Sequence, residues 1–468
     1  MALRVHNTLT RQKEEFVPLR GRRIHMFVCG LTPYDHAHLG HAKTYVAFDV
    51  IARYLRHKGY SVFYLQNVTD VDDHIVDAMR ARGLPREDVI RPYWEEYLEV
   101  MDALNVTSVN LFANATDYVH EIVEQIQGLI AKEHAYSVDG DVYYAVDSFE
   151  GWGRLSGQKT EEHLAGARVE VDERKRNPAD FALWKSQKQG EPAWDSPWGK
   201  GRPGWHIEDT AITIARFGPQ YDIHGGATEL MFPHHEAEIA QAEAFTGKRP
   251  FVKYWLHTGL LNIKGEKMSK SLGNFWALKD ALREYDGEVL RFFLVYAHYR
   301  SPIDFSPESL VEAKASYARI TESIANLDAE LRGAAAAGPE DAQLRSAAKR
   351  AREAFEAAMD DDFNTREAVA AVFDLASAVN KALGRAGKEA LADTRTAFET
   401  FGEVLGLWRG QKDGREGLAE GLIDALVQLR EDARGRKDFA LSDRIRDLLA
   451  AQRVALEDTK TGVRWKAR

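Results

Sequence analysis

Two histidines close to the start of the chain have types and spacing suited to phosphate chemistry. His38 and His41 flank Gly40, directly after an apolar, β-prone run at 24–28 and before a helical pattern. A strand, a loop and a helix in this order place functional groups at the carboxyl end of a strand, where open α/β sheets bind ligands. Backbone N–H groups at the start of such a helix suit a phosphate, and both histidines could donate hydrogen bonds to it.

A second motif strengthens this interpretation. Alone, two histidines near a helix start are as often capping or solvated groups. Downstream, the run KMSKS places Lys267 and Lys270 in a loop flanked by Gly265 and Gly273. Two lysines in a mobile loop can close positive charge over a triphosphate, although alone they could be a surface charge cluster. Together, at this separation, the two motifs favour a nucleotide-binding function.

His234 and Glu238 are candidates for a metal site. They lie four residues apart, so on a helix they share one face. The surrounding run PHHEAE offers other pairings, and a helix rich in histidine and glutamate is often simply solvated. Elsewhere, Asp70, Asp72 and Asp73 cluster after an expected strand, but their spacing fits no EF-hand loop. We interpret that acidic cluster as a capping turn in preference to a Ca²⁺ or Mg²⁺ site.

Composition narrows the class of protein. A length of 468 residues suggests about three domains, and 44% hydrophobic residues can bury a core. The formal charge of −10 argues against a protein coated with nucleic acid, but local Lys/Arg clusters can still contact an RNA partner. The single cysteine, Cys29, cannot form an internal disulfide, which fits a reducing compartment. No apolar run approaches a membrane span and the N-terminus shows no signal core, so we expect a soluble, cytoplasmic protein.

The pattern along the chain predicts mixed α/β structure followed by helices. Strands are expected at 24–28 and 61–66, a helix between them to about residue 58, and helices over 86–135. An Asp-Gly pair within 136–146 predicts a β-hairpin. The nearby Trp184, Trp194 and Trp198 are interpreted as packing residues. From residue 333 the chain is rich in Ala, Glu and Arg, with helical spacing and linkers at 334–338 and 410–417.

Six stretches of the sequence resemble the cysteinyl-tRNA synthetase family of class I aminoacyl-tRNA synthetases. They are HNTLTRQKEEF (6–16), CGLTPYDHAHLGHAKTYVAFDV (29–50), LQNVTDVDDHI (65–75), RPGWHIED (202–209), DIHGGATELMFPHHEAEIAQ (222–241) and GEKMSKSLGN (265–274). The likeness runs from end to end of the chain, and several of the motifs are long and specific.

The resemblance implies an α/β fold with a Rossmann-like parallel-sheet catalytic domain. An insertion splits that domain, and an α-helical bundle and a small C-terminal anticodon-binding domain follow it. The expected ranges are 1–135 and 201–275 for the catalytic halves, 136–200 for the connective insertion, 276–338 for a helical connector, 339–410 for the helical-bundle tRNA-binding domain and 411–468 for the anticodon-binding domain.

The implied activity is that of a cysteine–tRNA ligase. The carboxylate of L-cysteine attacks the α-phosphate of ATP, giving cysteinyl-adenylate and pyrophosphate. The cysteinyl group then passes to the 3′-terminal adenosine of tRNA(Cys). ATP, L-cysteine and tRNA(Cys) are thus the expected partners, with one Zn²⁺ per chain and Mg²⁺ accompanying ATP. The chain is expected to act as a monomer.

The resemblance also assigns roles at matching positions. Phosphate contacts during catalysis fall to His38, His41, Lys267 and Lys270. The resemblance adds His224 and Gly226 on the ribose and adenine side of ATP. The family usually has HGGG followed by an Asp here, whereas this chain has HGGA and Glu229. The amino-acid pocket is expected to include Gly30, Thr69 and Trp205, of which the last two could equally be packing residues.

The implied zinc ligands are Cys29, His234, Glu238 and position 209. The family has a cysteine at that last position, whereas this chain has Asp209. Zinc accepts carboxylate oxygen as well as thiolate, so Asp209 is an expected ligand. A carboxylate donates less electron density, which predicts a more electrophilic and less tightly held ion. The alternative is that zinc affinity has been lost.

Two other functions are compatible with parts of the sequence. One is a ligase that joins cysteine to an amino-sugar. That class of enzyme lacks the tRNA-reading C-terminal region, which residues 339–468 of this chain resemble. The other is a catalytically silent tRNA-binding paralogue, against which the two phosphate motifs argue. Basic residues of the last segment either contact tRNA or form a solvated helix; they are Arg434, Arg436, Lys437, Arg444, Arg446 and Arg464, with Trp465 beside them.

Overall fold

The computed structural model describes residues 2–158, 173–263, 265–267, 275–408, 415–436, 438–452, 454–459 and 462–467. The chain forms two compact units, Met1–Leu407 and Trp408–Arg468. Among the described residues, no helix is both long enough and apolar enough to cross a bilayer.

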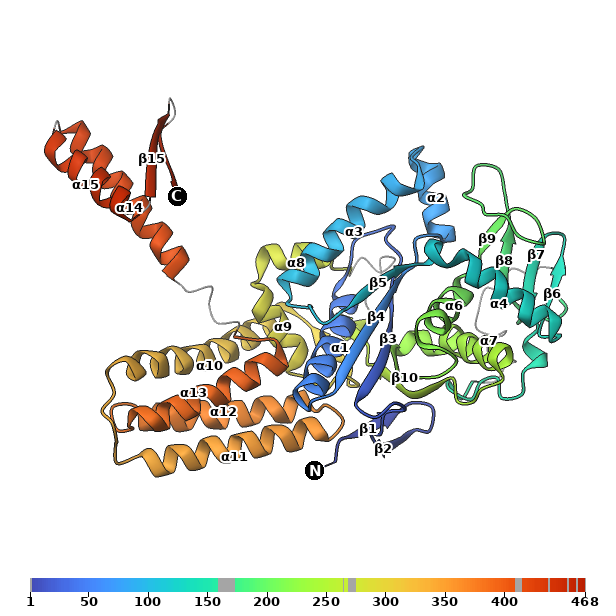
Figure 1. Ribbon diagram of the computed structural model, residues 1–468, viewed down its shortest axis with the longest axis horizontal. Coiled ribbons are helices and arrows are strands. Elements are labelled where there is room, and N and C mark those ends of the chain that lie inside the picture. Colours follow the sequence, from blue (N-terminus) through green and yellow to red (C-terminus); the bar gives the residue numbers. More distant parts are fainter. Residues whose placement is uncertain are drawn as a thin grey trace. The chain divides into compact units, whose positions relative to one another are not determined.

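A five-stranded parallel sheet lies at the centre of the first unit (Figure 1). Apart from the short edge strand at 111–114, its strands are nearly continuous buried runs, as expected when helices cover both faces. In spatial order they are β11 (Val252–Thr258), β10 (Tyr221–Ala227), β3 (Arg23–Leu31), β4 (Ser61–Val68) and β5 (Leu111–Asn114). The strands expected at 24–28 and 61–66 lie within β3 and β4, so both predictions are confirmed.

The strand order places a topological switch point beside β3. The chain moves from β3 through helix α1 (Leu39–His57) to β4 on one side, whereas β10 and β11 are added on the other side. In open α/β sheets the crevice outside the carboxyl ends of strands at such a point is the usual ligand site. The His38 motif lies there, because it connects β3 to α1.

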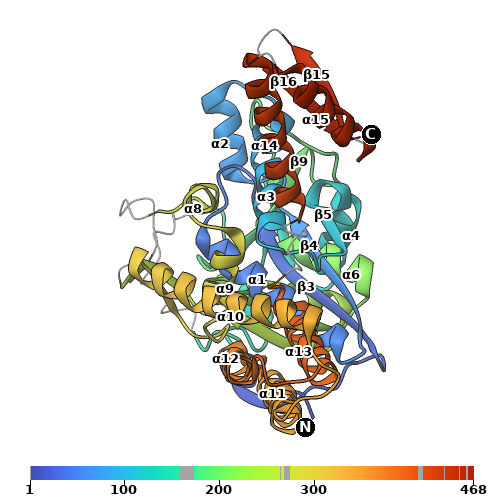
Figure 2. The ribbon, with the colours of Figure 1, turned by 90° about the vertical axis from the view of Figure 1, so that its left-hand side faces the viewer.

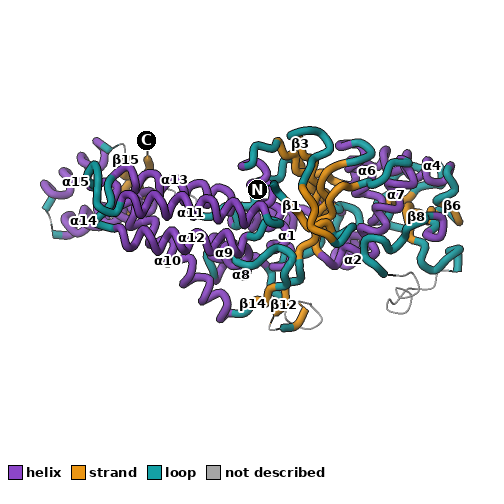
Figure 3. The backbone as a smooth tube through the Cα atoms, turned by 90° about the horizontal axis from the view of Figure 1, so that it is seen from below, coloured by secondary structure: helices purple, strands orange, loops and turns teal. Residues whose placement is uncertain are grey.

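Helices cover the two faces of this sheet (Figures 1 and 3). A Cβ added at Gly225 would meet Phe48 of α1, whereas one added at Gly226 would meet His235 on the opposite face. That opposite side carries α4 (Val119–Ala131), α6 (Trp205–Phe217) and α7 (Glu236–Thr246), which pack on one another. The chain leaves β4 through α2 (Asp73–Arg82) and α3 (Arg86–Ala103).

One prediction for this region is wrong. The range 86–135 is not helical throughout, because the edge strand β5 lies between α3 and α4. This strand has only four residues, LFAN, which is too short to display an alternating pattern. The capping interpretation of the acidic cluster is supported, since Asp72 accepts the backbone N–H of His74 at the start of α2 at 2.8 Å.

A four-stranded antiparallel sheet occupies the range expected for the insertion and extends slightly beyond it, to 135 and 203. Its strands are β6 (Ala135–Val138), β7 (Asp141–Tyr144), β8 (Phe181–Ser186) and β9 (Gly201–Pro203). Asp139 and Gly140 have φ values of +51° and +86° in the turn between β6 and β7, so the Asp-Gly hairpin is confirmed. Trp184 is fully buried and its ring lies 6.1 Å from that of Trp198, which agrees with a packing role.

Smaller elements connect the catalytic sheet to the helices. A two-stranded sheet comprises β1 (Arg4–Asn7) and β2 (Gln12–Glu15). A three-stranded sheet has β12 (Leu261–Ile263) between β13 (Glu266–Lys267) and β14 (Ile303–Phe305). Two helices, α8 (Leu278–Glu284) and α9 (Gly287–Val295), lie between β13 and β14 in the chain.

A bundle of long helices completes the first unit (Figures 1 and 2). It contains α10 (Pro307–Gly333), α11 (Asp341–Asp360), α12 (Thr365–Ala382) and α13 (Lys388–Leu405). Because α10 packs on α12 and α13, the bundle begins within the range expected to be a connector. Asn364 caps α12 by accepting the N–H of Glu367, so the expected capping break before this helix is present.

The second unit contains two helices and a β-hairpin. They are α14 (Arg415–Gly435), α15 (Phe439–Ala451), β15 (Val454–Thr459) and β16 (Gly462–Ala467). Its small core consists of Ile445, Leu449 and Val454.

A buried ion pair fixes α1 against α9. Arg291 and Asp49 both have fully buried side chains, and Arg291 Nη2 donates to Asp49 Oδ2 at 2.6 Å. The same guanidinium donates to the carbonyls of Leu104 and Leu405, at the ends of α3 and α13. Although burial opposes it, the charge of Arg291, assisted by Arg53, lowers the pKa of Asp49. This pair therefore connects the helix that bears the histidines to the bundle.

Replacing Asp49 should strongly destabilise the first unit. Asp49→Ala leaves the Arg291 guanidinium buried without its anion, which we expect to cost about 3–5 kcal/mol of unfolding free energy. The matched control is Asp393→Ala, which removes an exposed partner of Arg352 and should cost less than about 1 kcal/mol. Guanidinium titration followed by tryptophan fluorescence measures both. Equal effects of the two substitutions would contradict the role of Asp49.

Candidate active site and metal centre

His38 and His41 both cap α1 and line a cavity. His41 N–H donates to His38 Nδ1 and His38 N–H donates to His41 Nδ1, each at 3.3 Å. The two rings are stacked, with centroids 3.7 Å apart. The capping interpretation and the ligand interpretation of the sequence are thus compatible, because capping uses Nδ1 and leaves Nε2 of each ring.

The capping bonds determine what these rings offer to a ligand. Burial lowers the pKa of His38 to about 4 and lowers that of His41 well below its ordinary value, so both rings are neutral near pH 7. In each ring Nδ1 accepts a backbone N–H, and a neutral imidazole then carries its proton on Nε2. The helix start therefore presents two uncharged N–H donors.

The cavity beside these rings has a volume of about 430 Å³. It is lined by the carboxyl end of β3, the start of α1 and the segments after β10 and β11; its polar and glycine residues include Cys29, Gly30, His38, His41, Trp205, Glu229 and Gly259. Gly30 has no room for a side chain, since an added Cβ would lie 1.7 Å from the Asn67 carbonyl oxygen. Its N–H donates to Asn67 Oδ1 at 2.5 Å.

Four candidate metal ligands meet at one edge of this cavity. The donor atoms of Cys29, Asp209, His234 and Glu238 all lie within 4.8 Å of one another, and all four residues are buried. Cys29 comes from β3, Asp209 from α6 and Glu238 from α7, with His234 in the turn before α7. Asp209 Oδ2 lies 3.0 Å from Cys29 Sγ and 3.1 Å from His234 Nε2.

The electrostatics of this cluster fit a cation. Burial and the neighbouring Asp209 carboxylate raise the pKa of both Cys29 and Glu238 well above their ordinary values. Within the described part of the chain, neither carboxylate oxygen of Glu238 nor Oδ1 of Asp209 has a hydrogen-bond partner. A divalent ion would satisfy these oxygens and offset the repulsion between the buried acids. The residues present therefore suit a metal with mixed sulfur, nitrogen and oxygen ligands.

His206 and Trp205 orient His234. The Nδ1 atoms of His206 and His234 lie 2.8 Å apart. When His234 ligates through Nε2, its Nδ1 carries the proton and donates to His206, which is the usual outer support of a metal-binding histidine. The Trp205 ring stacks on His234 at 4.2 Å and lines the cavity. Sequence reasoning did not single out His206, although its place beside Trp205 was a signal.

A second donor set overlaps the first. Cys29, His224, His235 and Glu238 also lie within 4.8 Å of one another. His224 and His235 are fully buried, and neither contributes to the cavity lining. Asp209 and His234 do not line the cavity either, but Trp205, which does, stacks on His234, so the first set has a second connection to the cavity besides the shared Cys29.

The other predicted site residues do not all lie at the cavity. Neither His224 nor Gly226, predicted for the ATP side, lines the cavity, whereas Ala227 and Glu229 do. Thr69 is buried and accepts a hydrogen bond from Asn67 Nδ2 at 3.3 Å. The backbone of Lys267 pairs with Asn262 in the small sheet. Lys270 lies outside the described residues.

Comparison with solved structures shows which fold the chain shares. A methionyl-tRNA synthetase of Mycobacterium tuberculosis in complex with methionyl-adenylate aligns with a TM-score of 0.58 at 18% identity, over 82% of this chain and 89% of that chain. A putative arginyl-tRNA synthetase of Campylobacter jejuni aligns with a TM-score of 0.54 at 13% identity, over 82% and 93%. The fold is that of the class I aminoacyl-tRNA synthetases.

Comparison of sequences identifies the family. Residues 15–315 match the catalytic domain model of class I (C) tRNA synthetases, and 354–409 match the DALR domain. A cysteine–tRNA ligase of Geobacter sulfurreducens is 48% identical over 100% of both chains. One of Thermococcus onnurineus is 46% identical over 100% of this chain and 99% of its own. The chain belongs to the cysteine–tRNA ligase family.

The donor cluster predicts one metal site that depends on position 209. With Zn²⁺ as the probe, Asp209→Ala should weaken binding at least about tenfold, because it removes one ligand. Asp209→Cys should tighten binding, since thiolate is the better zinc donor. Competition with a chromogenic chelator measures each affinity, and Asp195→Ala, at an exposed carboxylate, is the control. Unchanged affinity in Asp209→Ala would remove this residue from the ligand set.

Proposed function

We propose that this chain ligates L-cysteine to tRNA(Cys), and that Zn²⁺ held by Cys29, Asp209, His234 and Glu238 selects the cysteine thiolate. One observation carries the proposal: Cys29 of the buried donor cluster lines the same cavity as the paired histidines, and Trp205, which also lines it, stacks on His234. One end can thus recognise a side chain while the other binds phosphates. The metal would supply a Lewis acid. A thiol loses its proton and binds such an ion far more readily than a hydroxyl does.

In the first step the cysteine carboxylate oxygen attacks the α-phosphorus of ATP, and the bond to the β-phosphate oxygen breaks as pyrophosphate leaves. This step needs orientation and stabilisation of charge on phosphate rather than a protein nucleophile. His38 and His41 donate their Nε2–H groups to the phosphates. Lys267 and Lys270 of the KMSKS run add positive charge, and Mg²⁺ accompanies ATP.

The amino acid occupies the part of the cavity next to the donor cluster. Trp205 forms the wall there, since it lines the cavity and stacks on His234. Gly30 lines the cavity at the end of β3, and family likeness assigns Thr69 to the polar end of the amino acid. Glu229 and the adjoining segment face the nucleotide side. Discrimination against serine then does not depend on pocket shape, which separates two such similar side chains poorly.

The second step transfers the cysteinyl group from the adenylate to a ribose hydroxyl of the terminal adenosine of the tRNA, with release of AMP. The DALR match at 354–409 and the C-terminal unit support a tRNA acceptor. The rival amino-sugar ligase lacks this region, while the relatives named above extend over the whole chain. We expect the enzyme to act as a monomer in the cytoplasm.

Exchange of pyrophosphate into ATP tests this function directly. The zinc-loaded chain should catalyse exchange with cysteine and prefer cysteine over serine by more than about 10²-fold, beyond what pocket shape provides. Removal of zinc should reduce that preference. In a second assay, tRNA(Cys) and not an amino-sugar should accept the cysteinyl group. Absence of cysteine-dependent exchange in the zinc-loaded protein would contradict the proposal.

His38→Asn separates capping from catalysis. Asparagine is a good N-cap, so stability should change by less than about 1 kcal/mol. The variant lacks the Nε2–H donor, so the rate of adenylate formation should fall about 10²–10³-fold with little change in the KM for cysteine. Because the pKa of His38 is about 4, the parent rate should show no His38 titration between pH 6 and 8.

Rapid-quench measurement of adenylate per active site checks this prediction. His120→Asn, at an exposed histidine of α4, is the matched control and should leave the rate unchanged. A His38→Asn rate equal to that of the parent would show that the ring contributes only its cap.

A further inference from the structure

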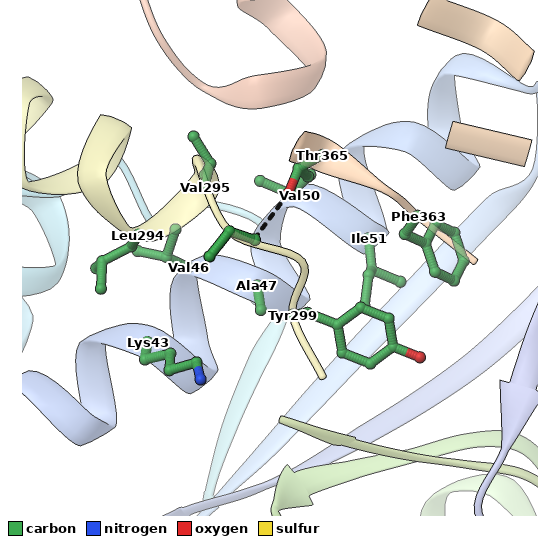
Figure 4. Close-up of a pocket in the computed structure, with 11 residues that line it drawn as sticks. Lys43, Val46, Ala47, Val50, Ile51, Leu294, Val295, Tyr299, Phe363 and Thr365 are labelled. Carbon is green, nitrogen blue, oxygen red and sulfur yellow. Dashed lines mark hydrogen bonds between the residues drawn. The ribbon is translucent and has the colours of Figure 1, made fainter. Parts of the chain in front are cut away.

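Lys43 is a buried lysine whose role the catalytic scheme above does not explain. It lies on α1, two residues after His41, and is 3% exposed. Figure 4 shows it on the same helix as Val46, Ala47 and Val50, next to the segment that carries Leu294, Val295 and Tyr299. These residues line an apolar cavity of only about 10 Å³, too small for a substrate.

The Lys43 ammonium binds two backbone carbonyls and forms no ion pair with the described acidic residues. Its Nζ donates to the carbonyl of Leu260 at 3.0 Å and to that of Ser301 at 2.6 Å. Burial alone lowers the pKa of Lys43 to about 7. A buried ammonium without an anion costs folding free energy, so its presence calls for an explanation other than charge pairing.

The two carbonyls belong to segments that shape the active site. Gly259 and Leu260 line the 430 Å³ cavity, and they lead directly into β12 and β13, where Lys267 lies. Ser301 precedes β14, the strand that pairs in parallel with β12. Lys43 therefore connects the helix bearing the two histidines to both strands beside the lysine motif.

The segments are also fixed to each other. Gly259 N–H donates to the Tyr299 carbonyl at 2.9 Å, and Ile303 N–H donates to the Leu260 carbonyl at 3.0 Å. A Cβ added at Gly259 would lie 2.4 Å from the Arg300 carbonyl oxygen, so the two backbones are in direct contact. A shift at Ser301 would consequently move Gly259 and Leu260 relative to the histidines.

We propose that Lys43 is a positioning residue for adenylate formation. It holds the Gly259–Leu260 wall and the adjoining strands β12 and β13 at a fixed distance from His38 and His41. The proposal rests on the adenylating activity proposed above. Lys43 does not touch the reactants; it acts through the two carbonyls that it binds. The protein thereby keeps the Gly259–Leu260 wall in register with the two histidines, where small displacements have large effects on rate.

The test compares Lys43→Met, which keeps the stem but loses the donors, with Lys43→Arg, which retains N–H donors. In pyrophosphate exchange, normalised to active sites by the adenylate burst, Lys43→Met should lower kcat about 10–100-fold and change the KM for cysteine less than about twofold. Lys43→Arg should recover most of this loss. Lys253→Met is the matched control, since Lys253 also donates to a carbonyl, that of Val17, away from the cavity.

Hydrogen exchange measured by mass spectrometry gives a second readout on folded protein. Lys43→Met should speed amide exchange in 259–263 and 301–305 and leave α11–α13 unchanged. If Lys43→Met fails to fold, Lys43→Gln takes its place with the same two readouts.

A per-site kcat within twofold of the parent overturns the proposal, as does a loss of activity explained by the unfolded fraction alone. Because every variant is compared with the active parent, failure of the Lys43 proposal is distinct from failure of the proposed function. In the latter case, the parent itself would show no cysteine-dependent exchange.

Discussion

Buried negative charge at the carboxyl end of β3 is the constraint on which the site depends. A thiol and two carboxylates, from Cys29, Asp209 and Glu238, converge in a buried region, where Asp209 and Glu238 raise the cost of ionising Cys29 and Asp209 raises that of Glu238. Such a cluster is stable as an ionised set only with a cation among its members. The same strand end supplies Gly30, whose backbone opens onto the cavity, and leads to the helix start with His38 and His41. Side-chain recognition and phosphate binding are therefore set by one strand and its following turn.

Two strands of the catalytic sheet, β3 and β4, could be predicted from local patterns. The apolar runs of β3 and β4 and the Asp-Gly turn of the insertion are short-range features, so the sequence alone identifies them. The strand β5 was not predicted, because four residues are too few to show a periodic pattern. The fold class required the resemblance of whole motifs, since the order β11-β10-β3-β4-β5 joins strands that are up to about two hundred residues apart in the chain.

The site shows where sequence reasoning ends. Spacing suggested His234 and Glu238, and family likeness added Cys29 and Asp209, but no local pattern reveals that His224 and His235 form an overlapping donor set. Capping of α1 by the two histidines is likewise a matter of ring geometry, and it determines which nitrogen faces the ligand. The connections of Arg291 and Lys43 could not be predicted either, because most of their partners are backbone carbonyls of distant segments, which carry no sequence signature.

The replacement at position 209 alters the character of the donor cluster more than its charge. An aspartate and a cysteinate each bring one negative charge, so the electrostatic balance with a divalent ion is the same. What changes is softness, since only Cys29 now offers sulfur. An incoming thiolate would then be the second soft ligand of the ion rather than the third, and selectivity against a hydroxyl depends more on that incoming sulfur. Trp205, which lines the cavity and stacks on His234, would limit the direction from which a side chain could reach such an ion.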